Sequence, residues 1–314
     1  MNSAPRRFAR ARTDVAALWF TALTGLATAL ILAILALILG YLFVQGGSQV
    51  SWHFLTGGTD SDMFDADKAG IFPMLVGTAA RVFLMTLMVM PVGVTTAVYL
   101  TEYARTTSPL TRFIRSAVGN LAGVPSIVFG LFGVGFFVSF IGGSLDALSG
   151  STEPQWGKPA LLWASATLAI MTLPVVIVAT EEALKAITPG LREASLALGA
   201  TKLETIIRIV LPNALPGILT GGILAVSRAA GEVAPILFTG AAYYLKDTPK
   251  ALSDQFMDLS YHVWVLSTQS PNVELTRPIL FGTVVVLLLL TFSLNLVAVL
   301  IRARIRRRLR SASH

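Results

Sequence analysis

Residues Glu193 to Pro216 read EASLALGATKLETIIRIVLPNALP, the longest polar interruption in the second half of a chain that is otherwise strongly apolar. Just before it, Thr188-Pro189 supplies an N-cap and a proline at the first helical position. Apolar and small residues then recur at helical spacing as far as Gly199, which is expected to end the helix. This pattern predicts one short amphipathic helix.

A second short helix is expected directly after the first. Thr201-Lys202-Leu203-Glu204 has the form of a capping box, in which the glutamate side chain reaches back to the N-cap amide. An apolar stripe follows, and we expect Pro212 to end the helix. Both helices are too short to cross a bilayer. Residues 189–212, called here the two-helix loop, are therefore predicted to form a compact docking surface at the membrane face.

The composition of the chain excludes a soluble protein. Of the 314 residues, 54% are hydrophobic and 13% are charged, and the mean hydropathy is +0.72. These values indicate an all-α integral membrane protein. With no cysteine and only three scattered histidines, the chain offers neither disulfides nor an evident metal centre.

Six apolar segments each reach the roughly 20 residues that a spanning helix needs. They cover about residues 15–44, 70–100, 116–145, 160–180, 214–242 and 278–301. We predict a basic N-terminus at 1–14, a six-helix transmembrane domain at 15–301 and a basic tail at 302–314. There is no P-loop motif, so any coupling to ATP requires a separate subunit.

Basic residues are distributed unevenly between the two sides of the membrane. Residues 1–14, 101–115, 183–210 and 302–314 hold 17 of the 24 Lys and Arg side chains. The positive-inside rule then places both termini and the two-helix loop in the cytoplasm. The net charge of +7 is explained by this bias and by an arginine-rich tail facing anionic lipid, and it does not require nucleic acid.

Three charged residues lie inside predicted spans. Arg228 is expected at the centre of the fifth span, with Glu232 one turn later. Charges within a bilayer are costly and usually face a pathway, although two opposite charges can also neutralise each other. An arginine suits a tetrahedral oxyanion because its planar fork donates two hydrogen bonds. Arg81, roughly 15 Å into its span, either snorkels or pairs, or else lines the pathway.

The two-helix loop resembles the EAA loop of ABC importer permeases. The resemblance rests on Glu193-Ala194, Gly199 and Ile209-Val210-Leu211-Pro212, while Ser195 replaces the usual second alanine. In that family the loop forms coupling helices that sit in a groove of a cytoplasmic ATPase. The resemblance implies that ATPase coupling involves Glu193, Ala194, Gly199, Leu211 and Pro212.

A narrower resemblance is to PstA-type permease subunits of phosphate-specific ABC transporters. It is carried by SRAAGEVAPILFT at 227–239, AGVPSIVFGLFG at 122–133 and TEEAL at 180–184. In that family the arginine matching Arg228 is associated with phosphate transport, and an acidic residue matches Glu232. The predicted substrate pathway comprises Arg228, Glu232, Arg81 and Ser126, the last within the second motif.

The resemblance implies half of a translocation pore in a bacterial cytoplasmic (inner) membrane. The implied partners are a second, PstC-type permease subunit, two PstB-type ATPase subunits that hold the ATP and magnesium, and a PstS-type phosphate-binding protein. This chain is then a pore subunit that binds no cofactor and catalyses no reaction. Alternatives are import of another solute, such as molybdate, sulfate or an amino acid, and an ATPase-independent channel or carrier.

Overall fold

The computed structural model describes residues 15–58, 65, 68–105, 107–150 and 153–311, and these are almost entirely helical. Within them, six segments are long and apolar enough to cross a membrane, as the sequence predicts. They are Val15–Gly46 (α1), Phe72–Tyr103 (α3 and η1), Ser126–Ser149 (α5, η2 and α6), Leu161–Lys185 (α7), Lys202–Gly231 (α9, η3 and α10) and Val273–Arg307 (within α13, Val273–Ser311).

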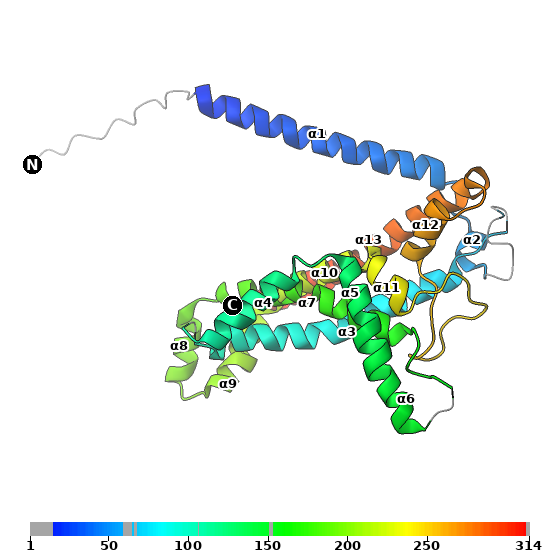
Figure 1. Cartoon of the computed structure of the whole chain (residues 1–314). Helices are drawn as coiled ribbons and strands as arrows, with labels where there is room; N and C mark the ends of the chain where they lie inside the picture. Colours follow the sequence, from blue (N-terminus) through cyan, green and yellow to red (C-terminus); the bar gives the residue numbers. More distant parts are fainter. Residues whose placement is uncertain (1–14, 59–64, 66–67, 106, 151–152, 312–314) are drawn as a thin grey trace, which may run out of the picture.

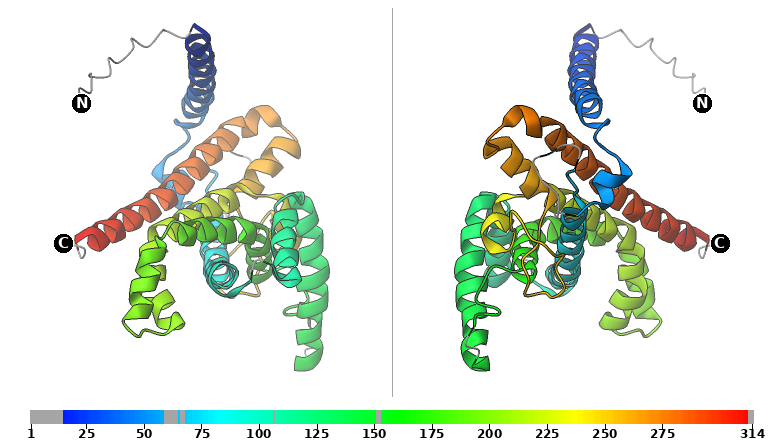
Figure 2. Two further views of the ribbon diagram at one scale, coloured as in Figure 1. Left: turned by 90° about the vertical axis from the view of Figure 1, so that its left-hand side faces the viewer. Right: turned by 90° about the vertical axis from the view of Figure 1, so that its right-hand side faces the viewer.

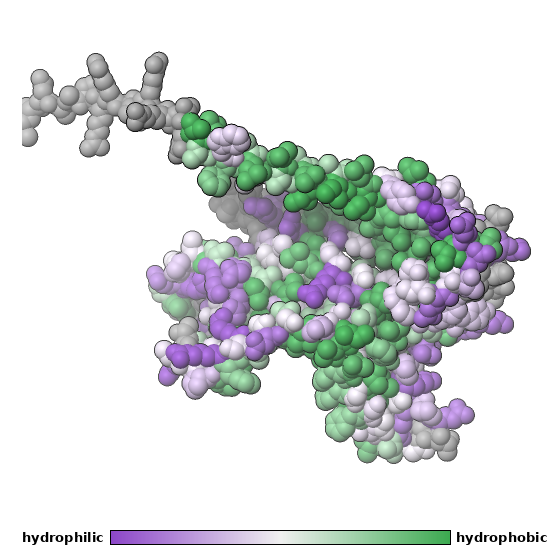
Figure 3. Space-filling model, turned by 45° about the horizontal axis from the view of Figure 1, so that its top comes forward, coloured by the Kyte–Doolittle hydropathy of each residue, from purple (hydrophilic) through white to green (hydrophobic). Residues whose placement is uncertain are grey.

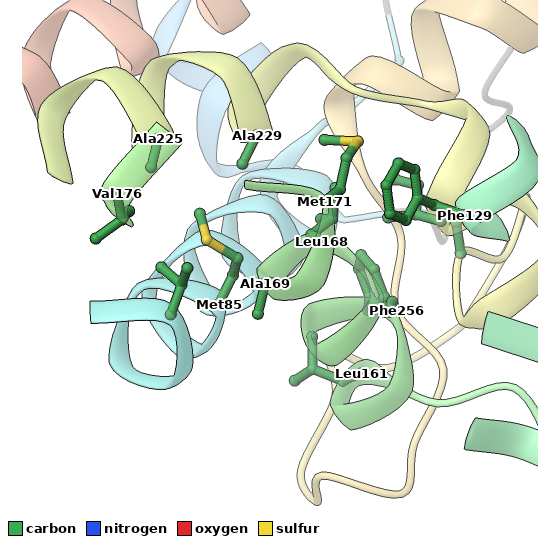
Figure 4. Close-up of a cluster of buried hydrophobic side chains, with 14 residues drawn as sticks. Met85, Phe129, Leu161, Leu168, Ala169, Met171, Val176, Ala225, Ala229 and Phe256 are labelled. Atoms are coloured by element: carbon green, nitrogen blue, oxygen red, sulfur yellow. The ribbon is translucent and has the colours of Figure 1, made fainter. Parts of the chain in front are cut away.

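Helix α7 forms the centre of the bundle and packs against α3 (Phe72–Val98) on one side and α10 (Leu211–Gly231) on the other. Their shared core contains Met85 from α3, Leu168 from α7 and Ala229 from α10, with Phe129 of α5 (Ser126–Gly133) at its edge (Figure 4). Most spans are apolar around their whole circumference, as expected for helices that contact lipid on one side and protein on the other.

The two ends of the bundle carry different elements (Figure 1). At one end lie α8 (Pro189–Ala197) and α9 (Lys202–Thr205), and the chain enters α1 and leaves α13 on this same side. At the other end lie α2 (Trp52–Thr56) and α12 (Leu259–Thr268). Hydrophilic residues gather at both ends, and the mainly apolar surface between them is interrupted by a small hydrophilic patch (Figure 3).

Helix α1 stands apart from the other spans over most of its length (Figure 2). It approaches the bundle near its last residue, Gly46, where a Cβ atom would lie only 2.4 Å from the carbonyl oxygen of Phe281 on α13. Tyr41 reinforces this junction by an edge-to-face contact with Phe281 and by accepting a hydrogen bond from Arg277. The first span is therefore anchored to the rest of the bundle at one end only.

The prediction of where the third span starts is wrong. Residues 101–115 were expected to be a loop and 116–145 a span, whereas α4 (Pro109–Leu121) is a separate amphipathic helix. The chain then breaks over residues 122–125 and re-enters a helix at Ser126. Pro125 explains the new start, because it cannot donate a backbone hydrogen bond and disfavours a helical conformation in the residue before it.

Pro212 does not end the second short helix, which is a further correction. The helix that starts at Lys202 passes through a π-helical turn, η3 (Ile206–Val210), and continues into α10. The amide of Leu211 bonds the carbonyl of Ile206, five residues back. Pro212 then falls in the first turn of α10, where its missing N–H is tolerated. The second part of the two-helix loop is therefore continuous with the fifth span.

Other boundaries also move. Span α7 was expected to end at residue 180 but extends to Lys185 and so includes Glu181 and Glu182, and the predicted tail continues α13 as a helix to Ser311. The outer loop 243–277 contains α12 rather than being only a loop. Residues 1–14, most of the acidic outer loop (Asp60, Asp62 and Asp67) and residues 312–314 lie outside the described residues.

Candidate functional sites

The fifth span is broken, which the sequence did not predict. Helix α10 ends at Gly231, and a six-residue helix, α11 (Ala234–Thr239), begins after Glu232 and Val233. Gly231 is a poor helix former, and Pro235 would clash with the carbonyl of residue 231 in a continuous helix. Arg228 consequently lies in the last turn of α10 rather than at the centre of a span.

Arg228 and Glu232 lie on either side of the end of α10, and their side chains approach each other. The Nε atom of Arg228 is 3.5 Å from Oε1 of Glu232, with the arginine side chain 42% exposed and the glutamate 22%. Within the described part of the chain, Nη1 and Nη2 of Arg228 donate no hydrogen bond. The guanidinium thus keeps its two terminal donors available.

Neighbouring helices hold the helical break in place. Ser227 donates a hydrogen bond to Oδ1 of Asn295 on α13, at 2.9 Å. Helix α5 packs closely on α11, because a Cβ at Gly130 would lie 2.8 Å from the carbonyl oxygen of Ala234. Ser126, the first residue of α5, is half-buried one turn before this glycine. Two predicted pathway motifs, 122–133 and 227–239, are therefore in direct contact.

Arg81 is fully buried and paired. Its Nη2 lies 2.9 Å from Oδ2 of Asp258, and both side chains are 0% exposed. Nη1 and Nη2 also donate to the carbonyl oxygens of Ala229 and Ala230, at 2.9 and 3.3 Å. Arg81 was expected either to snorkel or pair, or else to line the pathway, and in the structure it is buried and paired. The partner Asp258 was missed because it lies 177 residues away in an outer loop with no span-like signal.

The two-helix loop exposes most of its apolar side chains. Helix α8 contains no buried residue, and Leu198 is 90% exposed. Gly199 has φ +86°, which only glycine adopts easily, so it allows the chain to turn between the helices. The predicted capping box is present, because Thr201 and Glu204 cap each other reciprocally. Thr188, by contrast, makes no side-chain cap.

The predicted coupling residues divide into an exposed set and a packed set. Glu193 and Ala194 are exposed on α8, and Gly199 is exposed at the turn. Leu211 packs against the apolar cluster below the loop, and Pro212 is half-buried at the start of α10. The first helix of the loop and the turn are therefore exposed to solvent, while the end of the loop packs into the bundle.

An ion pair that sequence reasoning missed fastens the loop to the bundle. Arg192 of α8 donates through Nε and Nη2 to Oε1 of Glu102, at 3.2 and 2.8 Å. Its other donors reach the carbonyl oxygens of Ile187 and Leu184 at the end of α7. Glu102 lies in η1 (Tyr99–Tyr103), the π-helical end of the α3 span. One arginine thus joins α8, α7 and α3.

Histidine and carboxylate groups do not form a metal site in the described residues. His262 on α12 is buried, and burial lowers its pKa from 6.5 to about 4. Its Nδ1 has no hydrogen-bond partner among the described residues. This imidazole is therefore neutral inside the folded protein at ordinary pH.

The fold and these two sites define a class of protein: a six-span helical membrane subunit with an exposed loop at one end and a charged helical break in its fifth span. The chain belongs to the family described as binding-protein-dependent transport system inner membrane component, whose profile matches residues 90–311. That match covers the two-helix loop, the break and the last span.

Curated relatives cover most of the chain. It is 33% identical over 267 residues to a probable ABC transporter permease protein, YqgI, of Bacillus subtilis, covering 81% of this chain and 85% of the relative. It is 33% identical to the phosphate transport system permease protein PstA 1 of Mycobacterium tuberculosis over 76% and 72%. PstA of Haemophilus influenzae is 35% identical over 63% and 61%. The predicted PstA-type resemblance is confirmed.

Solved structures with low sequence identity share the fold. A bacterial ABC transporter involved in import of the acidic polysaccharide alginate matches with a TM-score of 0.62 and 16% identity, over 93% of this chain and 97% of that chain. The inward-facing MetNI methionine ABC transporter matches with a TM-score of 0.52 and 19% identity, over 75% and 94%. The predicted importer-permease architecture is confirmed.

Proposed function

We propose that this chain is a permease subunit of an ATP-driven importer of inorganic phosphate and forms half of its pore. The observation that carries the proposal is Arg228, a cation at a helical break with two unused donors. Relatives named phosphate transport system permease proteins, similar over most of the chain, support the choice of anion.

The chemistry of the break suits a phosphate anion in passage. A guanidinium presents parallel N–H donors that match two oxygens of a tetrahedral anion, and it stays protonated. Glu232 occupies the Nε side and so orients the fork while leaving Nη1 and Nη2 for the substrate. The glutamate also limits how strongly the anion is held, which favours release over trapping. Ser126, at the start of the helix packed on α11, adds a hydroxyl to the pathway.

In this proposal Arg228 faces the second permease subunit. A partly exposed charge on a spanning helix is expensive against lipid, and such residues usually face a partner or a water-filled route. A PstC-type subunit would supply the other wall. Arg81, being enclosed by protein, lies behind this wall and does not contact the anion in the described conformation.

The two-helix loop serves as the docking site for a PstB-type ATPase, two copies of which hold the ATP and magnesium. The exposed leucines of the loop form an apolar surface of the kind that partner subunits cover. These are Leu191, Leu196, Leu198 and Leu203. A PstS-type binding protein delivers phosphate at the opposite end, beside α2 and α12. Both termini then face the cytoplasm, in keeping with the distribution of basic residues.

The residues of the chain have three roles in this assignment. The basic segment 1–14 and the tail 302–314 lie on the cytoplasmic side, and the tail contacts anionic lipid. Residues 15–301 form the permease domain. The loop 189–212 transmits the closing of the ATPase pair to the pore by alternating access. Hydrolysis takes place in the ATPase, so this chain itself catalyses no reaction.

The test is ATP-driven phosphate uptake by the four-component complex in liposomes, with Arg228→Ala and Arg228→Cys in this naturally cysteine-free chain. We expect uptake to fall at least ~100-fold in both, the scale of losing a charge-assisted interaction with the substrate. Modifying the introduced thiol with a cationic methanethiosulfonate should restore part of the rate, and an anionic reagent should not.

The matched control is Arg277→Ala, an exposed arginine at the opposite end whose hydrogen bond goes to Tyr41. It should transport at close to the wild-type rate. Uptake at the wild-type rate by an assembled Arg228→Ala complex would refute the role of the arginine. Stimulation of ATP hydrolysis by a sulfate-, molybdate- or amino-acid-loaded binding protein, and not by a phosphate-loaded one, would refute the assignment of phosphate.

A further inference from the structure

The end of α10 leaves backbone carbonyls without their usual helical partners inside the bundle. In a continuous helix the carbonyls of Ala229 and Ala230 would accept from the amides of residues 233 and 234. The break after Gly231 removes these bonds, and among the described residues only the carbonyl of Ala229, of the two, accepts from a nearby backbone amide instead, that of Glu232 at 3.3 Å. Both residues are 0% exposed, so water cannot easily replace the lost donors. Unsatisfied carbonyls at this depth would cost free energy and leave the shape of the break undetermined.

Arg81, on α3, donates to both carbonyls and is the donor to the carbonyl of Ala230. Its Nη1 donates to the carbonyl of Ala229 and its Nη2 to the carbonyl of Ala230. A cation at this position also complements the negative end of the α10 dipole. The planar guanidinium fixes two consecutive carbonyls at once, which constrains the direction in which the chain leaves the helix. The contact therefore determines backbone geometry and not charge balance alone.

Asp258 holds Arg81 in this position from the outer loop. Its Oδ2 lies 2.9 Å from Nη2 of Arg81 and accepts a hydrogen bond from Thr78 at 3.0 Å. Its Oδ1 caps α12 by accepting from the amides of Ser260 and Tyr261. One carboxylate thus ties α3 to the first turn of α12. Together with the hydroxyl of Ser260, which also donates to Oδ1, these groups make five contacts with the carboxylate.

The outer loop also touches the break directly. The hydroxyl of Ser260 lies 3.3 Å from the carbonyl oxygen of Glu232 and bonds more closely to Asp258. Because a hydroxyl has one hydrogen, the contact with Glu232 is the weaker arm of a three-centre bond. The backbone carbonyls of residues 229, 230 and 232 are thus each contacted by Arg81 or Ser260, while the side chains of Arg228 and Glu232 extend from the same five-residue segment.

We propose that Arg81 and Asp258 are positioning residues for phosphate passage: their buried ion pair fixes the α10–α11 break so that Arg228 presents its free donors to the pore. Buried ion pairs seldom stabilise a protein more than apolar side chains of the same volume. A pair at 0% exposure is therefore better explained by the geometry it imposes than by stability. This inference rests on the proposed role of Arg228.

The test uses the complete importer in liposomes and the double variant Arg81→Gln/Asp258→Asn. The change removes both charges together, and asparagine keeps the N-cap of α12. We expect phosphate uptake to fall about tenfold, which corresponds to about 1.4 kcal/mol in the transport barrier. Arg81→Lys is the second variant, because an ammonium keeps the charge but loses the planar fork, and it should also fall severalfold.

A thiol reporter separates positioning from stability. Gly231→Cys places a single thiol at the break, where a Cβ meets no atom within 4 Å, in a chain without other cysteines. Its rate of modification by a water-soluble reagent should change severalfold in both pair variants. The control Asp146→Asn alters a buried carboxylate that caps Trp156 and Gly157 instead, and it should leave the reporter rate unchanged.

The outcomes distinguish the two proposals. Wild-type uptake and reporter rate in the pair variants, with uptake still lost in Arg228→Ala, would overturn the positioning role and leave the proposed function intact. Normal uptake in Arg228→Ala would refute the proposed function itself. A double variant that fails to assemble, while Arg81→Lys assembles with normal uptake and reporter rate, would show that the pair is needed only for folding and would also overturn the inference.

Discussion

Two arginines lie at the same helical break, and their surroundings differ. Arg81 is enclosed by protein and bonds an aspartate and two carbonyls, whereas Arg228 is 42% exposed and its shortest contact with Glu232 is 3.5 Å, from Nε. The enclosed arginine uses its terminal donors to define structure. The exposed one keeps its terminal donors free for a ligand. The environment of each guanidinium, and not the residue type, separates these roles.

The largest expected difference in stability is between the variant that lacks only Arg81 and the variant that lacks only Arg228. Arg81→Ala leaves Asp258 buried without its cation and the carbonyl of Ala230 without its donor, a change that typically costs ~3–5 kcal/mol. Arg228→Ala removes a partly exposed pair, for which ~0–1 kcal/mol is typical. The half-life of the complex in detergent at a fixed raised temperature should therefore fall steeply for Arg81→Ala and little for Arg228→Ala.

The double variant Arg81→Gln/Asp258→Asn serves as the control for this contrast. It removes both charges, so no unpaired ion remains buried, and it should recover most of the half-life lost in Arg81→Ala. Equal half-lives for Arg81→Ala and Arg228→Ala would contradict the distinction between an enclosed and an available arginine.

A smaller effect should follow from the protonation of His262, on the helix that Asp258 caps. Burial lowers the pKa of His262 from 6.5 to about 4. Between these values the unfolded chain binds a proton that the folded chain does not, so stability is complete above pH 6.5 and is lost as the pH falls toward 4. The loss is at most about 3 kcal/mol, from 1.36 kcal/mol per pKa unit.

Detergent half-lives at pH 7.5, 6 and 5 measure this effect. His262→Gln should flatten the pH dependence, while the exposed His53 replaced by glutamine should leave it unchanged. Because α12 carries Asp258, acid should weaken the Arg81 side of the break before it affects Arg228. An identical pH dependence in wild type and His262→Gln would exclude this histidine as the cause.

The sequence predicts the six spans, the capping box and the glycine turn because each depends on neighbours within one or two helical turns. Apolar runs of about 20 residues and Thr201-Lys202-Leu203-Glu204 are local signals of this kind. The existence of the spans is accordingly confirmed, while several of their ends move by five to ten residues or more. End positions depend on tertiary packing and on π-helical turns that no residue pattern identifies.

Prolines illustrate the limit of local reasoning. Pro212 was expected to stop a helix, yet η3 accommodates it and the helix continues. No helix end was predicted at Pro235, yet the break in the fifth span lies just before it. A proline removes one donor in both cases, and the surrounding structure decides whether that gap is absorbed or becomes a break.

The partners of the buried charges could not be predicted either. Arg81 pairs with Asp258, and Arg192 with Glu102, across 177 and 90 residues of sequence. Such pairs form where the fold brings distant elements together, and a single sequence read by itself carries no signal for them. The sequence identifies which charges need a partner, because an intramembrane arginine is costly alone. It does not identify the partner.

The third arginine, Arg192, extends the comparison to the two-helix loop and should give the smallest effect. It is intermediate in burial, with its side chain 22% exposed and that of Glu102 10%. Glu102→Gln weakens the pair without changing the exposed face of the loop. We expect assembly to persist and phosphate uptake per ATP hydrolysed to fall about two- to fivefold, since a partly buried pair contributes ~1 kcal/mol.

The measurement is the ratio of uptake to ATP hydrolysis in the reconstituted complex. The control is Glu182→Gln, which removes an exposed pair with Lys185 three residues away on α7. Surface pairs of that kind contribute little, so its ratio should match wild type. Because η1 continues α3, the helix that carries Arg81, a lower ratio in Glu102→Gln alone would connect the loop to the break through one helix. An unchanged ratio would mean that movement reaches the break along α10 instead.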